Sequence, residues 1–210
     1  MMLLPPETIV LFTTASLALA LSPGPDNLFV LTQSAVHGRR CGLLITLGLC
    51  SGLLVHISAV ALGVAALLKT SAWAFTVLKI AGAAYLLYLA WLSFRAGASR
   101  IDRAAQPPAS AWALYGRGVV MNITNPKVAV FFLAFLPQFT DPARGSVSMQ
   151  IVLLGLLFMA AAWLVFSLIA LAAARLGGWL QRSARAQTCL NRAAGTVFVL
   201  LAGRLLLSKP

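Results

Sequence analysis

The sequence predicts an all-α membrane protein with several spanning helices, and three observations support this class. The chain has 210 residues, of which 60% are hydrophobic and 10% charged, and its mean hydropathy is +0.92. Soluble domains are nearer half apolar and a quarter charged. Six apolar runs follow one another along the chain, and a helix needs about 20 residues to cross a bilayer. We therefore predict one transmembrane domain, residues 1–210, with six spanning helices.

The predicted spans cover residues 7–36, 41–68, 72–94, 112–139, 147–175 and 188–207. The fifth has no charged residue from Ser146 to Ala174 and is the clearest. The first, second and fourth are longer than the bilayer requires, so we expect them to tilt, kink or break.

The basic residues predict the orientation. The net charge is +12, but the dense basic stripe with interleaved aromatic residues of a nucleic-acid surface does not occur. The charges lie between apolar runs, which predicts lipid, and no nucleic acid, as the partner. One side holds Arg39, Arg40, Arg95, Arg100, Arg103, Arg117, Arg175, Arg182, Arg185 and Arg192, and the other holds Lys69, Lys79, Arg144, Arg204 and Lys209. The first side is therefore predicted to be cytoplasmic and both termini periplasmic.

The two halves of the chain predict an inverted repeat. A polar linker, residues 96–111, separates three spans in residues 1–95 from three in residues 112–210, and an odd number of spans inverts the second set. The first and fourth spans break at matching positions, Pro23 and Pro126. The third and sixth spans also share a sequence pattern with the same spacing. It consists of Lys79, Ala81, Gly82 and Tyr85 in the third span and of Arg192, Ala194, Gly195 and Phe198 in the sixth.

The first break carries candidate transport residues. It reads Ser22-Pro23-Gly24-Pro25-Asp26-Asn27 within an apolar run. Two prolines remove two backbone donors, and glycine loosens the backbone further. The freed polar groups are tolerated in a bilayer only where protein or a water-filled cavity satisfies them. Asp26 and Asn27 are predicted to begin a new half-helix. A plain loop before an interfacial helix is the alternative.

The second break is the counterpart, with Asn122 shortly before Asn125-Pro126-Lys127. The residue before a proline avoids the helical region, so one helical segment is predicted to end at Asn125. Lys127 then lies in the first turn of the next half-helix, where the helix dipole and lipid both disfavour a cation. Another group must compensate its charge, unless Lys127 snorkels to the cytoplasmic interface.

An intramembrane carboxylate indicates function and needs a partner. Asp26 is the acidic residue that we place within the membrane, and Lys127 from the other break is its predicted partner. A purely structural pair is the alternative.

His56 is a second candidate for proton transfer. It shares a helical face with Gly48, Gly52, Ala59 and Gly63. Small residues at this spacing let another helix approach, and we expect the broken first span there. His56 would then face the cavity and relay a proton, although a hydrogen bond to a neighbour is the simpler role.

Other classes fit the sequence less well. Cys41, Cys50 and Cys189 are widely spaced, whereas a membrane thiol–disulfide carrier needs paired cysteines at its breaks. We therefore expect no enzyme activity and no cofactor. One carboxylate and one histidine form a poor cation cage, so no metal site is predicted and metal export is the runner-up. A non-transporting scaffold would leave the intramembrane charges without a purpose.

Three stretches resemble the LysE/RhtB superfamily of bacterial amino-acid exporters: LSPGPDN, HGRR and NPKVAVFFLAFLPQF. The resemblance covers nearly the whole chain in length, span count and motif order. It implies an inner-membrane carrier, driven by the proton-motive force, for amino acids such as threonine, homoserine, leucine or lysine. The PGP motif of the family falls on Pro23, Gly24 and Pro25, and its NPK motif on Asn125, Pro126 and Lys127. Many relatives have Asn directly after PGP, where this chain has Asp26.

With this resemblance, the two breaks are expected to meet near the midplane and to form the substrate site. Half-helix N-termini and Lys127 would bind the carboxylate of an amino acid, and Asp26 with freed carbonyls its ammonium group. Asp26 or His56 would exchange the coupled proton. A single carboxylate favours neutral, small or branched amino acids. The sequence leaves open which amino acid is moved and whether the chain forms a homo-oligomer.

Overall fold

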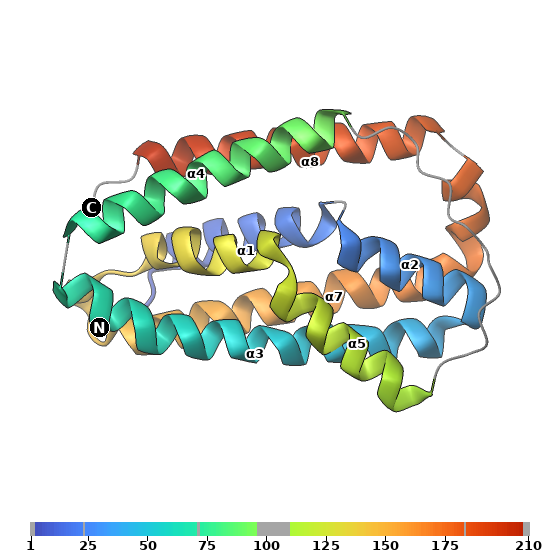
Figure 1. Ribbon diagram of the computed structural model, residues 1–210, viewed down its shortest axis with the longest axis horizontal. Coiled ribbons are helices and arrows are strands. Elements are labelled where there is room, and N and C mark those ends of the chain that lie inside the picture. Colours follow the sequence, from blue (N-terminus) through green and yellow to red (C-terminus); the bar gives the residue numbers. More distant parts are fainter. Residues whose placement is uncertain (1–2, 23, 71, 96–109, 183, 208–210) are drawn as a thin grey trace.

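The structure is a computed structural model in which the described residues are 3–22, 24–70, 72–95, 110–182 and 184–207 (Figure 1). Within these ranges the chain is helical apart from short connections, and no strand occurs. The predicted all-α class is confirmed for this part of the molecule. Pro23 and most of the predicted linker lie outside the described residues.

The helices follow the predicted apolar runs closely. The α-helices are α1 (Pro6–Leu21), α2 (Pro25–His37), α3 (Arg39–Thr70), α4 (Ala72–Arg95), α5 (Ala111–Thr124), α6 (Pro126–Val130), α7 (Val147–Arg182) and α8 (Ala184–Leu207). Between α6 and α7 lie a π-helix, η1 (Phe131–Phe135), and two 3₁₀ helices, η2 (Leu136–Phe139) and η3 (Pro142–Arg144).

Both predicted breaks are confirmed. The axes of α1 and α2 are bent by 58°, and those of α5 and the segment Pro126–Phe139 by 49°. Pro25 and Pro126 occupy the first positions of α2 and α6. Proline suits the start of a helix because the N–H that it lacks would have no partner there. The same residues therefore end one helical segment and begin the next.

Two described segments are long and apolar enough to cross a membrane: Arg39–Gly63 in α3 and Val147–Ala173 in α7. Each bent pair passes the same test when it is counted as one span, so the described residues contain up to four such spans. Large apolar side chains are exposed on several helices; the side chain of Leu62, for example, is 79% exposed. Exposure of this kind fits a surface that faces lipid.

The helices form three layers (Figure 1). On one side α3 packs against α7, and on the other α4 packs antiparallel to α8. Between them lie α1 and the segment from Pro126 to Phe139; α4 contacts η1, and α8 contacts α1. Buried phenylalanines fill this middle layer, and the ring of Phe131 in η1 lies 5.0 Å from that of Phe158 in α7. The broken spans therefore occupy the centre of the molecule.

The small-residue face of α3 binds a different helix from the one expected. A Cβ atom added at Gly48 would overlap the backbone of α5 at Tyr115, and one added at Gly118 of α5 would overlap the backbone of α3 at Ile45. The two backbones can cross this closely only because both positions lack a side chain. The partner of this face is thus the first half of the broken fourth span, and the expectation of the first span was wrong.

Candidate functional site

At the first break, the end of α1 leaves carbonyl groups without their usual partners. The carbonyl of Leu19 would normally accept a hydrogen bond from the N–H of residue 23, but proline has none. The backbone N–H of Ser22 donates to the Leu19 carbonyl at 3.2 Å, and the Lys127 ammonium donates to the Ser22 carbonyl at 3.0 Å and to the Leu19 carbonyl at 3.4 Å. The Asn27 side-chain amide donates to the Ala20 carbonyl at 2.7 Å. Side chains from beyond the break therefore satisfy the last turn of α1.

At the second break, Asn125 bonds in two directions. Its Oδ1 accepts from the backbone N–H of Lys127 at 3.0 Å, which caps the N-terminus of α6. Its Nδ2 donates to Oδ2 of Asp26, in the first turn of α2, at 2.9 Å. The side chains of Asp26, Asn125 and Lys127 are 1%, 3% and 7% exposed, so this network is shielded from outside.

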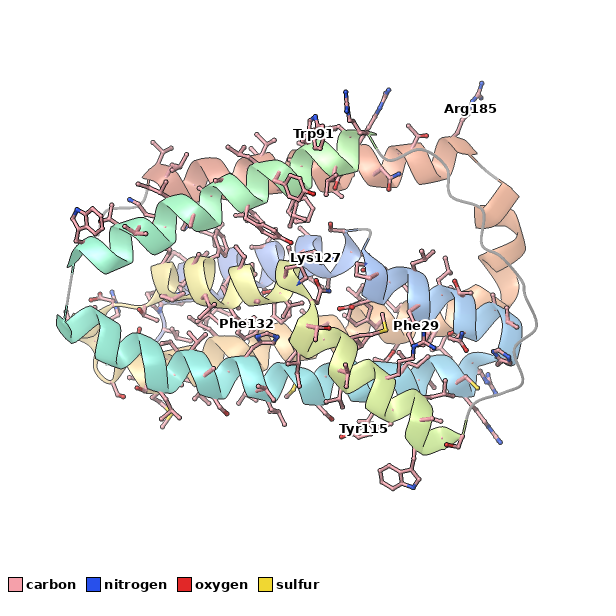
Figure 2. All side chains as sticks on the ribbon, viewed as in Figure 1. Phe29, Trp91, Tyr115, Lys127, Phe132 and Arg185 are labelled. Carbon is pink, nitrogen blue, oxygen red and sulfur yellow. The ribbon has the colours of Figure 1, made fainter. Side chains whose placement is uncertain are left out.

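The two breaks thus meet, and the predicted site residues Asp26, Asn125 and Lys127 lie in one cluster. Figure 2 shows Lys127 at the centre of the molecule, beside the junction of α1 and α2. The contact between carboxylate and ammonium is nevertheless indirect, since no carboxylate oxygen of the described residues lies within 4.0 Å of the Lys127 nitrogen. Asn125 bridges the two residues by bonding to the carboxylate of one and the backbone of the other.

Several polar atoms of the site are buried without a hydrogen-bond partner. They are Oγ of Ser22, Oδ1 of Asp26, Oδ1 of Asn27 and Oδ1 of Asn122. An unsatisfied buried polar group costs about 1–3 kcal/mol, so such atoms call for a ligand or water. The oxygens of Asp26, Asn27 and Asn122 are acceptors, and the Ser22 hydroxyl can accept as well as donate, which suits a ligand that donates hydrogen bonds.

A small cavity lies at this cluster. Its volume is about 10 Å³, and its polar lining comes from Asp26, Asn122 and Lys127. The remaining walls are mostly apolar and are contributed by Leu19, Ala20, Leu53, Val128, Phe158, Ala162 and Phe166. The space suffices for about one water molecule. A larger ligand therefore requires the surrounding helices to move apart.

Two other predicted residues, His56 and Gly24, lie next to this cluster. His56 Nε2 lies 3.2 Å from the backbone carbonyl of Asn122, and its ring lies 5.7 Å from that of Phe132. His56 does not line the cavity, which places it behind Asn122. A Cβ atom added at Gly24 would come within 3.0 Å of the Lys127 nitrogen. Glycine at this position therefore lets the ammonium reach the end of α1.

The sequence reasoning missed the apolar walls of the cavity. Phe158, Ala162 and Phe166 of α7 line it with Leu53 of α3. Their spacing along α7 places them on one helical face, but the same pattern occurs wherever a helix packs in a core. No sequence signal distinguishes a cavity wall from ordinary packing.

Comparison with known proteins identifies related efflux and membrane proteins. The chain is 36% identical over 198 residues to a homoserine/homoserine lactone efflux protein of Salmonella typhimurium, with 94% of each chain covered. It is 34% identical over 189 residues to an uncharacterized membrane protein of Vibrio cholerae, covering 90% of this chain and 91% of the other. It is 30% identical over 200 residues to a leucine efflux protein of Klebsiella pneumoniae, with 92% of each covered.

No solved structure matches the chain. The family model described as LysE type translocator matches residues 17–209, which include both helix breaks. This protein therefore belongs to the LysE-type translocator family, whose members are transporters.

Proposed function

We propose that this protein exports small neutral amino acids across the bacterial inner membrane in exchange for protons, through the site where the two breaks meet. The observation that carries the proposal is the set of unpartnered, buried acceptor atoms beside Lys127. The names of two relatives, a homoserine/homoserine lactone and a leucine efflux protein, support the substrate class.

The acceptor atoms suit the ammonium group of an amino acid. Asp26 Oδ1 and Asn122 Oδ1 are buried and lack a donor. An ammonium group supplies three N–H donors and a positive charge, and it would satisfy both atoms while compensating the Asp26 carboxylate. Because Asp26 is the one carboxylate among the described residues that line the cavity, a substrate with one positive charge fits better than one with two.

The start of α2 suits the carboxylate group. This helix has no side-chain cap at its N-terminus, so amides of its first turn are available to an anion. The positive end of the helix dipole favours a negative charge at the same place. Asp26 itself belongs to this first turn, so both ends of a zwitterion would bind within a short distance. The apolar walls would contact the side chain of the amino acid.

We further propose six spans that form an inverted repeat of three and three. The helices α4 and α8 have 24 residues each, which corresponds to about 36 Å and is enough to cross the bilayer. With the two bent pairs, α3 and α7, they complete six. Matching proline breaks in α1–α2 and α5–α6 support the repeat, as does the antiparallel packing of α4 on α8.

The proposed topology predicts opposite locations for two reporter fusions. A reporter fused after Arg103 should be cytoplasmic, and one fused after Arg144 periplasmic, because basic residues are concentrated on the first side. Alkaline phosphatase is active only in the periplasm and green fluorescent protein fluoresces only in the cytoplasm, so paired fusions at each position give independent readings. Finding both positions on one side would contradict the six-span arrangement.

The transport activity predicts resistance to toxic amino-acid analogues. Cells that express the protein should grow at higher concentrations of homoserine or leucine analogues, and their intracellular level of the matching amino acid should fall. The matched control is Asp26→Ala at equal expression, which removes the carboxylate and should abolish both effects. Equal resistance in wild type and control would contradict the proposed site. Resistance to other solutes alone would contradict the substrate class.

A further inference from the structure

The Lys127 ammonium is bound by backbone carbonyl groups. Its nitrogen donates to the carbonyls of Leu19 and Ser22, and within the part of the chain that the structure describes no carboxylate oxygen lies within 4.0 Å of it. Both carbonyls belong to the C-terminal end of α1, where the helix dipole is negative. The side chain reaches this position past Gly24, whose missing Cβ leaves room for it. The ammonium is thus stabilised by the broken helix itself.

The ionisable groups around Lys127 are few. Asp26 on α2 is the group that interacts with it electrostatically, and His56 on α3 bonds to the backbone of α5. The residues of α7 that line the cavity are apolar. The helix α4, which also packs against α6, carries Lys79 and Tyr85, but neither lines the cavity or bonds to Lys127.

We propose that Lys127, and neither Asp26 nor His56, carries the coupled proton, because its ammonium group and the ammonium group of the substrate would lie in the same closed site beside the Asp26 carboxylate. This inference rests on the proposed function and assigns the coupling to one residue of the same site. The carboxylate of the substrate is matched by the amides at the start of α2. Two ammonium groups then share one side-chain carboxylate in a site with little room for water, which is unfavourable.

The repulsion between the two ammonium groups couples proton transfer to amino-acid transport. When an amino acid binds from the cytoplasm, Lys127 releases one proton to water on that side and becomes a neutral amine. The amine keeps two N–H donors, so it can still hold the carbonyls of Leu19 and Ser22 while the substrate occupies Asp26. After the amino acid leaves to the periplasm, the amine takes up one proton from that side. One proton moves inward for each amino acid that moves outward, and no charge is left unbalanced on Lys127.

Transport by purified protein in liposomes tests this assignment. Two quantities are measured with radiolabelled homoserine and, separately, leucine: exchange of labelled for unlabelled amino acid without a pH gradient, and uptake driven by an acidic interior. One pH unit can drive roughly tenfold accumulation if one proton is exchanged for each substrate. The wild type should show both activities. Lys127→Gln should still exchange, at a reduced rate because the carbonyls of Leu19 and Ser22 lose the ammonium donor, but it should accumulate nothing, because it has no proton to release.

Further variants keep the test decisive. Lys127→Arg retains a cation that does not lose its proton, so it too should lose accumulation, and it decides the question if Lys127→Gln does not fold. Lys79→Gln, the matched control on α4, should keep both activities. Accumulation in either Lys127 variant would overturn the inference, and so would complete loss of exchange in a folded Lys127→Gln variant. If the wild type exchanges neither amino acid, the proposed function fails instead, which is a distinct result.

Discussion

A chain that carries Pro23→Ala together with Pro25→Ala should insert into the membrane normally and lose efflux completely. The substitutions return two backbone N–H donors to the first break. The restored N–H of residue 23 would bond to the Leu19 carbonyl, which now accepts from Lys127. A continuous helix would therefore displace the ammonium and remove the free N-terminus of α2. The measurement is efflux from loaded cells, with membrane-inserted protein quantified beside it.

The control for this variant is a second pair of prolines. Pro5→Ala with Pro6→Ala changes the same number of prolines at the start of α1, far from the break. This protein should transport at the wild-type rate. Normal efflux by a well-expressed Pro23→Ala, Pro25→Ala variant would mean that the break is not needed for transport.

Asn125→Ala should destabilise the protein by about 1.5–3 kcal/mol and abolish efflux. Asn125 Nδ2 is the hydrogen-bond donor of the buried Asp26 carboxylate, whose other oxygen already lacks a partner. Removing the amide leaves the buried carboxylate without a hydrogen-bond donor. The same change also removes the cap of α6 that positions Lys127. Thermal unfolding of the detergent-extracted protein measures the first effect, and efflux of the identified amino acid the second.

A double-mutant cycle of Asn125 and Asp26 separates the effect of the unpaired Asp26 charge from the loss of Asn125 packing. With Asp26→Asn in the same chain, Asn125→Ala should cost much less, because no ionised group is left unpaired. Stability should therefore recover while efflux stays absent. Strictly additive losses would show that Asn125 and Asp26 do not interact in the folded protein. Asp26→Asn alone should remain close to wild type in stability, since an amide oxygen can still accept from Asn125.

Much of this molecule could be predicted from residue pattern alone. The apolar runs gave helix boundaries within a few residues, and proline chemistry gave both breaks. The grouping of Asp26, Asn125 and Lys127 followed from the expectation that the breaks meet. These features depend on local backbone chemistry or on lipid thickness, which act the same way in every sequence.

The pattern of bonds within the site was not predictable. A buried ammonium can bond to a carboxylate or to free carbonyls, and the choice depends on where α1 ends relative to α6. The structure places Lys127 on the carbonyls and gives the carboxylate to Asn125. The face of small residues on α3 could be predicted from the sequence, but the helix that packs against it could not. Glycines at helical spacing indicate that another helix approaches closely, but they do not indicate which one. The π-helix at Phe131–Phe135 carries no distinguishing pattern.

The cap of the first break reaches the membrane late during synthesis. Lys127 follows Ser22 by 105 residues, and ribosomes add about 5–20 residues per second. Lys127 is consequently synthesised roughly 5 to 20 s after Ser22, so the Ser22 carbonyl has no ammonium donor during that time. A bare carbonyl costs several kcal/mol in hydrocarbon. A nascent chain arrested before α5 is therefore exposed at this break, which makes it the first place where an insertase would have to shield the chain or a quality-control protease could recognise it.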